Sequence, residues 1–266
     1  GPHIYPPCTE DDRAINMRIP KFSIIIPCFN AEKWIEECLR SALNQDYENL
    51  EIIFIDNEST DSSLQIANRL ATELAALEDP PNFMISSAKN IYPNCWDEAR
   101  ASGFELMTGE YVLVMGADDF LEKSFVSKCM KIIQTRPDKI LALQSPIRGV
   151  GHKQTITGYV THKYASLKEF KDQSLQRCPV NTPTVIYNTS LYREGLLETK
   201  PEVYGGAADY DLYCSLADNE IMIFPAPIWL GFNYRWHPEQ ATWKVQKEGV
   251  NYDKMIQEYW SNQWKT

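Results

Sequence analysis

Short apolar runs alternate with amphipathic segments through the first 115 residues, and this alternation restricts the possible folds more than any other feature. The apolar runs have strand length and are rich in β-branched residues, at 22–26, 50–55, 83–86 and 111–115. Segments with apolar residues at helical spacing lie between them, at 30–43, 62–77 and 94–107. Asn30 is the predicted N-cap of the first helix. Because strands and helices alternate, we predict a parallel sheet with right-handed crossovers, whose ligands bind at the carboxyl ends of the strands.

Beyond residue 135 the alternation weakens and the sequence becomes rich in turns, which suits substrate-specific loops. Strands are predicted at 140–144, 185–187, 222–224 and 228–234, and helices at 209–217 and 245–264. We therefore predict one α/β domain over residues 21–266, with two halves at 21–135 and 136–266. Residues 1–20 are expected to be a leader, because Gly1-Pro2-His3 resembles a protease-cleavage scar.

The chain carries a formal net charge of −10, with 26 Lys and Arg against 36 Asp and Glu. Binding to nucleic acid requires clustered Lys and Arg, which this sequence lacks, so a nucleic-acid partner is not expected. An acidic chain that binds a phosphorylated ligand is expected to use a metal ion for that purpose.

Seven cysteines are scattered along the chain without any Cys-x-x-Cys pair. This pattern matches neither a disulfide framework nor a zinc site, so we expect reduced core thiols and a cytoplasmic location. No apolar run reaches the roughly 18 to 20 residues that a bilayer span needs, so at most peripheral membrane association is expected.

Two adjacent acids, Asp118 and Asp119, follow the fourth predicted strand directly. They favour a divalent cation, because hard cations prefer oxygen ligands and keep part of their coordination shell for phosphates and water. The alternative is a helix cap, because Asp119 and Glu122 resemble a capping box before a helix at 121–135. Asp56 also follows a strand, so we expect Asp56 and Asp118 to lie at the same edge of the sheet.

Several short motifs occur along the chain in a fixed order. They are SIIIPCFNAE at 23–32, SALNQ at 41–45, IDNESTD at 55–61, AR at 99–100 with TGEY at 108–111, ADD at 117–119, ADYDL at 208–212 and YRWH at 234–237. Their order and spacing resemble those of the inverting family 2 glycosyltransferases with a GT-A fold. The resemblance implies a Rossmann-like α/β fold, with a mostly parallel central sheet flanked by helices. Residues 21–135 would form the nucleotide-binding half, and residues 136–266 the acceptor half with the C-terminal helix.

The resemblance assigns nucleotide binding to residues near the strand ends. Asp56 stands where the family accepts a hydrogen bond from the ring N–H of the base, with an Asx turn as the alternative. Pro27, Phe29 and Glu32 would line the base and ribose pocket, although the first two could equally pack the sheet edge. Arg100 would bind the diphosphate or close the pocket, unless it is a surface helical residue. The predicted nucleotide-binding set is Pro27, Phe29, Glu32, Asp56, Arg100, Ala117 and Asp118.

Asp118 corresponds to the last carboxylate of the family's D-x-D pattern, which the resemblance assigns to Mn²⁺ or Mg²⁺ at the diphosphate. Gly116 stands where the family has its first acid. The site would then bind the metal more weakly, use Asp119, or recruit His237. The predicted metal ligands are Asp118 and His237.

Asp209 is the predicted catalytic base, because it matches the family's base position. An inverting transfer needs a carboxylate that takes the proton of the acceptor hydroxyl. The alternative is a helix start, because Asp209 and Asp211 are ordinary first-turn residues. Ala208 replaces the family's usual Glu, so Asp209 is the only match for the base, and Asp211 is expected to anchor the helix.

The family brings the last motif over the diphosphate, where Arg235 and His237 could donate to phosphate oxygens. Asp119, Arg235 and Trp236 are candidate contacts to the donor, its diphosphate or the acceptor. Trp236 and Trp243 bracket a turn, and both are candidates to stack on an acceptor sugar.

Together these residues predict a metal-assisted, inverting glycosyltransferase of the hexosyl- or N-acetylhexosaminyl-transferase type. It would move a sugar from a nucleotide-diphosphate donor, preferably a UDP-sugar, to a hydroxyl of a carbohydrate or lipid-linked saccharide by a single displacement. The expected process is polysaccharide biosynthesis, and homo-oligomer formation stays open. A catalytically silent sugar-nucleotide or glycan-binding module is the alternative, because Gly116 and Ala208 replace acids. A dinucleotide oxidoreductase is disfavoured, because residues 27–30 are not a glycine-rich phosphate loop.

Overall fold

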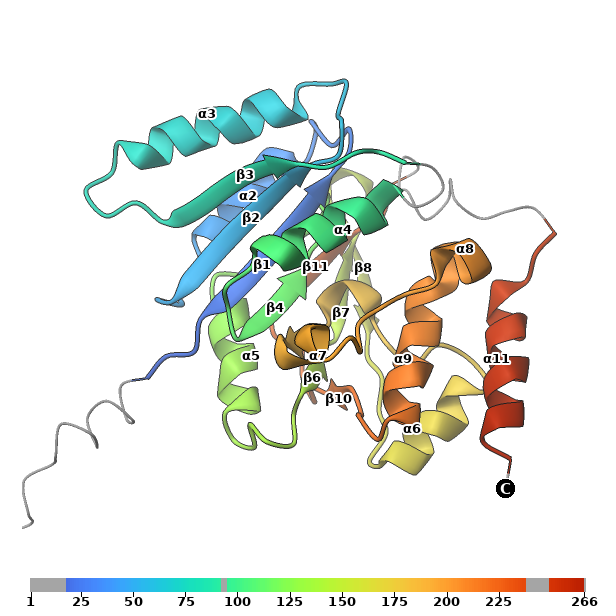
Figure 1. Cartoon of the computed structure of the whole chain (residues 1–266). Coiled ribbons are helices and arrows are strands. Elements are labelled where there is room, and N and C mark those ends of the chain that lie inside the picture. Colours follow the sequence, from blue (N-terminus) through green and yellow to red (C-terminus); the bar gives the residue numbers. More distant parts are fainter. Residues whose placement is uncertain (1–17, 92–94, 238–248, 266) are drawn as a thin grey trace, which may run out of the picture.

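A seven-stranded sheet forms the centre of the molecule in the computed structural model, which describes residues 18–91, 95–237 and 249–265 (Figure 1). The strand order is β10-β6-β9-β4-β1-β2-β3. The strands are β1 (Phe22–Cys28), β2 (Leu50–Asp56), β3 (Asn82–Ser87), β4 (Tyr111–Val114), β6 (Ala142–Gln144), β9 (Ile186–Asn188) and β10 (Phe224–Pro225). Strands β1 to β4 run parallel, and β9 is antiparallel to both of its neighbours. The predicted mixed α/β fold with a mostly parallel sheet is confirmed.

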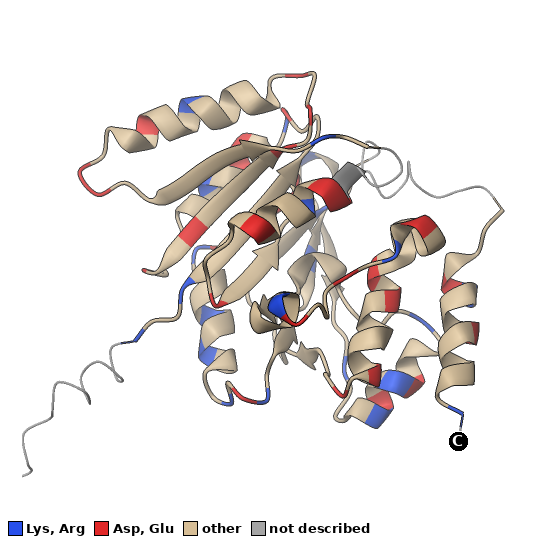
Figure 2. Cartoon of the chain, viewed as in Figure 1, with Lys and Arg blue, Asp and Glu red and all other residues tan. Residues whose placement is uncertain are grey.

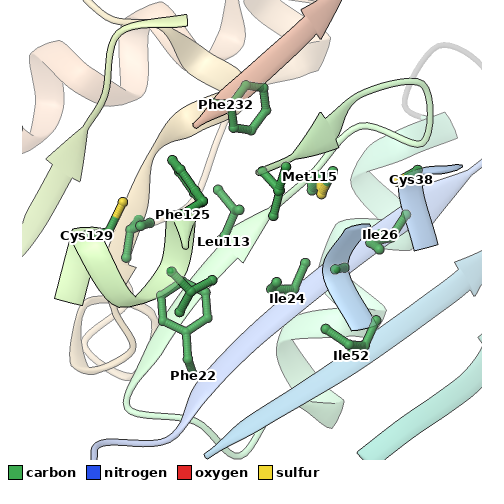
Figure 3. Packing of buried hydrophobic residues seen from close by; sticks show 14 of the residues in the cluster. Phe22, Ile24, Ile26, Cys38, Ile52, Leu113, Met115, Phe125, Cys129 and Phe232 are labelled. Atoms are coloured by element: carbon green, nitrogen blue, oxygen red, sulfur yellow. The ribbon is translucent and has the colours of Figure 1, made fainter. Parts of the chain in front are cut away.

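Alternate residues of the central strands pack against helices on opposite faces of the sheet. Ile24 on β1 belongs to the core that also contains residues of α2 (Ile35–Leu43), α3 (Ser63–Ala75) and α5 (Phe125–Ile133), part of which Figure 3 shows. Ile25 belongs to a second core, with residues of α4 (Cys95–Leu106), α6 (Leu167–Ser174) and α9 (Ala208–Asp218). The uninterrupted isoleucine run of β1 therefore reflects burial on both faces, as expected for a parallel strand.

A second, four-stranded sheet has the order β5-β11-β7-β8. Its strands are β5 (Phe120–Leu121), β11 (Phe232–Arg235), β7 (Ile147–Val150) and β8 (Ile156–Val160). Strand β11 is antiparallel to β5 and parallel to β7. Because β5 directly follows the acidic pair, this pairing brings the last sequence motif beside Asp118 and Asp119.

The C-terminal part covers α9 with a third apolar cluster. Helix α11 (Tyr252–Gln263) contributes Ile256 and Trp260, and α9 contributes Tyr210 and Cys214. Short helices α7 (Ser190–Arg193) and α8 (Pro201–Tyr204) precede α9, and 3₁₀ turns occur at His152–Gln154, Thr182–Thr184 and Gly205–Ala207. Figure 1 shows α11 beside α9.

Several predicted boundaries are wrong. The first helix begins at Ile35 rather than at residue 30, and the helix predicted from residue 121 begins at Phe125. The last helix begins at Tyr252, whereas the first residues of its predicted range lie outside the described part of the chain. Strands β5, β7 and β8 and helix α6 were not predicted. For β8 the reason is that it is exposed along its whole length and lacks the alternation of a half-buried strand.

Among the helices of the described residues, none is both long enough and apolar enough to cross a bilayer. Figure 2 shows basic and acidic residues interspersed on the outer helices, for example on α6. Cys28, Cys38, Cys129, Cys178 and Cys214 are free thiols, and all but Cys178 are buried.

Candidate functional site

The carboxyl ends of β1, β2 and β4 meet at one edge of the central sheet, because these strands are parallel neighbours. Asp56 is the last residue of β2 and pairs in register with Cys28. Only 5% of its surface is exposed, and its Oδ1 accepts no hydrogen bond from any residue that the structure describes. A buried carboxylate oxygen without a donor is costly, so this atom is suited to receive an N–H of a ligand.

Side chains join the loops that follow β1 and β2. Asn30 has a left-handed φ of 49°, and its Oδ1 accepts the backbone N–H of Thr60 at 2.8 Å. Glu32 accepts the backbone N–H of Ser62 at 2.9 Å, while its own N–H donates to Asp61 Oδ2 at 3.1 Å. Asn30 is therefore a link between two loops, and the prediction that it caps the first helix is wrong.

Asp118 contacts His237, which lies 119 residues further along the chain. The Nε2 atom of His237 lies 2.6 Å from Asp118 Oδ2. The imidazole stacks on the indole of Trp34, with ring centroids 3.9 Å apart, and only 8% of His237 is exposed. The predicted pair of metal ligands is thus brought together, and Trp34 fixes the plane of the imidazole.

Arg235 joins the acidic loop to helix α2. Its backbone N–H donates to Asp119 Oδ1 at 3.1 Å, and its Nε donates to the backbone oxygen of Asp118 at 2.9 Å. Its Nη2 donates to Glu37 on α2. A fixed loop keeps the carboxylate of Asp118 in place before any ligand arrives, which lowers the entropy cost of binding.

Asp119 lies inside the loop and is 2% exposed. Burial and the neighbouring charge of Asp118 raise the pKa of Asp119 well above its ordinary value, although Arg235 opposes the shift. Its side chain accepts from Arg235, and the nearest helix begins six residues later at Phe125. The alternative that Asp119 starts a helix is therefore wrong.

The donor set around Asp118 fits a divalent cation whose remaining ligands come from a bound molecule. One carboxylate and one imidazole meet, and no group of three candidate ligand side chains occurs among the residues described. A Cβ added at Gly116 would lie 3.1 Å from Asp118 Oδ1 and from Asp119 Oδ2, so the glycine leaves this side of both carboxylates uncrowded. Mg²⁺ and Mn²⁺ commonly bind through few protein ligands together with substrate phosphates and water.

Asp209 is paired with Arg100. Arg100 Nη1 donates to Asp209 Oδ1 at 3.0 Å, and Nη2 donates to Thr199 Oγ1 at 2.8 Å. Burial lowers the pKa of Arg100, but the carboxylates of Asp209 and Asp97 outweigh it and raise the pKa above its ordinary value. Arg100 is thus a largely buried partner of the predicted base, and the alternative of a surface helical residue is wrong.

Two cavities flank these groups. One of about 130 Å³ is lined by Pro27, Arg100 and Asp209, together with apolar residues such as Phe104 and Tyr213. The other, of about 200 Å³, is lined by His237, Arg235, Trp236, Trp34 and four residues from two loops. The first cavity joins the end of β1 to the start of α9, and the second lies beside the pair of Asp118 and His237.

The remaining candidates have different surroundings. Phe29 is 50% exposed at the strand edge, Trp236 is 40% exposed, and Ala117 is buried. Asp211 is buried and accepts from Trp260 Nε1 of α11 at 2.9 Å, so it joins two helices. Trp243 lies outside the described residues.

Sequence reasoning missed the residues that support the site. Trp34, Glu37, Asp97 and Thr199 carry no functional signal in the sequence. Except for the pair of Asp97 with Arg100, which lies within one helix, their contacts join distant parts of the chain. Thr199 is 99 residues from Arg100, and Trp34 is 203 residues from His237. Only the assembled fold reveals such contacts.

A family sequence model and a curated relative both relate this chain to glycosyltransferases. The sequence model of Glycosyl transferase family 2 matches residues 23–199. Chondroitin synthase of Escherichia coli is 27% identical over 266 residues, which cover 97% of this chain and 35% of that protein.

Two solved structures show the same fold. The structure of S. aureus TarS 1–349 in complex with UDP-GlcNAc has a TM-score of 0.64 at 20% identity, over 85% of this chain and 62% of that one. The mannosyltransferase PcManGT from Pyrobaculum calidifontis, in complex with GDP-Man and Mn²⁺, has a TM-score of 0.59 at 16% identity, over 84% of this chain and 59% of that one. The chain thus spans about three fifths of these structures and about a third of the chondroitin synthase.

Proposed function

Because the chain belongs to glycosyl transferase family 2, we propose that it transfers a sugar from a nucleotide-diphosphate donor to a hydroxyl of a saccharide or lipid-linked saccharide. A UDP-sugar is the proposed donor, and the TarS complex with UDP-GlcNAc supports this choice. The chondroitin synthase relative supports an acceptor of the polysaccharide class.

The observation that carries this proposal is the shared cavity of Pro27 and Asp209. Pro27 lies near the end of β1, and Asp56 ends the neighbouring strand β2 at the same edge of the sheet. A nucleotide held at this edge would direct its sugar toward the carboxylate of Asp209. Asp56 Oδ1 would accept the ring N–H of the base, which it can do because no described donor occupies it. Phe29 and Glu32 would complete the pocket for base and ribose.

The proposed chemistry is a single displacement with inversion. The acceptor oxygen attacks the anomeric carbon, the bond from that carbon to the diphosphate oxygen breaks, and Asp209 takes the proton of the acceptor hydroxyl. Arg100 holds Asp209 in place by its hydrogen bond of 3.0 Å. Trp236, with 40% of its surface exposed, offers a ring face to the acceptor.

Asp118 and His237 would hold Mn²⁺ or Mg²⁺ at the diphosphate. When bound, the cation would neutralise negative charge on the leaving nucleotide. Arg235 fixes the loop on which Asp118 lies, and Trp34 fixes the imidazole of His237. We also propose a cytoplasmic location, since free buried thiols such as Cys38 and Cys129 fit a reducing compartment.

The test combines nucleotide binding with turnover. Calorimetric titration with UDP, with and without Mn²⁺, is paired with an assay of sugar release from UDP-sugars in the wild type and in Asp209→Asn. We expect tighter UDP binding with Mn²⁺ in both proteins, and a turnover that falls by about 100-fold or more in the variant. Nucleotide binding without any turnover in the wild type would favour a silent binding module. That alternative is based on Gly116 and Ala208, which replace acids of the family's motifs. Full turnover in Asp209→Asn would remove Asp209 from the mechanism.

A further inference from the structure

Arg100 lies between two carboxylates at the wall of the smaller cavity. Its Nη1 faces Asp209 Oδ1 at 3.0 Å, while Nη2 lies 3.4 Å from Asp97 Oδ1 and donates to Thr199 Oγ1 at 2.8 Å. The side chains of Arg100, Asp97 and Asp209 are only 18%, 20% and 31% exposed. One cation is therefore shared by two carboxylates where solvent screens them little.

Asp97 and Thr199 contact the terminal nitrogen of Arg100 that does not bind Asp209. Asp97 and Arg100 lie one turn apart on α4, and Thr199 Oγ1 also lies 3.5 Å from Asp97 Oδ1. The other oxygen, Asp97 Oδ2, is buried and accepts no hydrogen bond within the described part of the chain. Because each terminal nitrogen of Arg100 has its own partner, the guanidinium cannot turn toward Asp97 without leaving Asp209.

This ion pair joins two distant parts of the chain. Arg100 lies on α4, which packs against β1 and β2, whereas Asp209 lies in the first turn of α9, 109 residues later. The orientation of the Asp209 carboxylate is thus set by a helix of the nucleotide-binding half.

The groups that face this pair from other elements are Tyr187 on β9, Tyr213 on α9, Cys178, and Glu202 on α8, which acts on Asp97. Burial raises the pKa of both tyrosines and of the Cys178 thiol, so these three stay neutral at neutral pH. Among the residues that the structure describes, Arg100, Asp97 and the exposed Glu202 remain as the charged groups near this pair. Of these three, Arg100 carries the positive charge.

We propose that Arg100 is a positioning residue for Asp209, and that Asp97 and Thr199 fix it for this task. Arg100 orients Asp209 at the cavity and places a positive charge beside its carboxylate, while Asp97 limits this effect by sharing the same cation. This role rests on the proposed function, because it assumes that Asp209 takes the proton of the acceptor. It differs from the sequence-based prediction that Arg100 binds the diphosphate.

The test is the pH dependence of kcat/KM in three variants. Arg100→Met removes the cation, so we expect kcat to fall by about tenfold or more and the acidic limb of the profile to move up by about one pH unit, with the donor KM nearly unchanged. Arg100→Lys keeps the positive charge but loses the second terminal nitrogen of the guanidinium. The acidic limb of its pH profile should therefore stay near that of the wild type, while kcat is reduced. Asp97→Asn removes the competing carboxylate, so its limb should move to lower pH.

Opposite shifts in Arg100→Met and Asp97→Asn cannot come from a common loss of folding, and thermal unfolding with UDP titration checks each variant. If Arg100→Met does not fold, the acidic limbs of the pH profiles of Arg100→Lys and Asp97→Asn test the proposal: the first should be unmoved and the second should move to lower pH. An unmoved acidic limb together with a donor KM raised about tenfold or more would place Arg100 on the diphosphate and overturn the proposal. Failure of the proposed function is distinguishable, because the wild type would then show no turnover, or Asp209→Asn would retain it.

Discussion

At the scale of single residues, the site is built from polar atoms whose partners come from distant parts of the chain. His237 meets Asp118, Arg100 meets Asp209, and Asp56 keeps one buried oxygen without a described donor. Asp118 and Asp209 each have a partner within the protein, whereas Asp56 Oδ1 has none among the described residues. The strongest prediction for nucleotide recognition therefore concerns Asp56.

Replacing Asp56 by Ala removes the proposed acceptor for the ring N–H of the base. A hydrogen bond to a charged group is worth about 1.5–3 kcal/mol, so UDP affinity should fall by about tenfold to 100-fold. Titration calorimetry with UDP measures the loss. CDP is the control ligand, because cytosine has no ring N–H at that position, and its affinity should change less. Equal losses for both nucleotides would contradict the assignment.

At the scale of elements, the sequence predicts what is local and fails where partners are remote. Strands β1 to β4 were found to within two residues. For β1, β2 and β4 the reason is that apolar runs are typical of doubly buried strands, whereas β3 is a partly exposed edge strand. The start of α2 was misplaced, because the polar side chain of Asn30 binds the loop at Thr60 rather than its own helix. The candidate site follows the same rule: Asp56, Asp118 and Asp209 could be named from motifs, but Glu37 and Thr199, whose partners Arg235 and Arg100 lie far along the chain, could not.

Helix α11 contributes to the placement of α9, which carries Asp209. Trp260 Nε1 donates to the buried Asp211 at 2.9 Å, and burial raises the pKa of Asp211 although this hydrogen bond opposes the shift. Trp260→Phe keeps a six-membered aromatic ring but loses the indole N–H and so leaves the carboxyl group without this donor. The free energy of unfolding should therefore fall by about 1–3 kcal/mol. Urea denaturation measures the change.

Trp264→Phe is the matched control for this prediction. Its indole also donates to a carboxylate, Asp218 Oδ1 at 3.1 Å, but that contact is exposed. Water can replace the lost donor there, so we expect a loss below about 1 kcal/mol. Equal losses in Trp260→Phe and Trp264→Phe would show that the buried hydrogen bond does not stabilise the junction of α9 and α11.

At the scale of the whole molecule, the central sheet is fastened at the end opposite to the site by one buried carboxylate. Glu51 on β2 accepts from Ser23 Oγ on β1 at 2.7 Å, and from Thr108 N and Oγ1, just before β4, at 2.6 and 2.9 Å. Lys21 Nζ lies 3.3 Å away. Three neighbouring strands are thus tied at their amino ends.

Glu51 makes the free energy of unfolding depend on pH in the acidic range. Burial alone would raise the pKa of Glu51, but the hydrogen bonds from Ser23 and Thr108 outweigh it, so the pKa is lowered in the folded state. A group with a lowered folded pKa stabilises the fold above its unfolded pKa, about 4.3 for Glu, and this stabilisation is lost as pH falls through the lower folded value.

Glu51→Gln should therefore be less stable at pH 7, yet lose less stability than the wild type between about pH 6 and pH 3. Denaturant unfolding at these pH values measures both effects, with Glu48→Gln on the exposed surface as the control. Parallel pH curves for Glu51→Gln and the wild type would mean that other carboxylates govern acid unfolding.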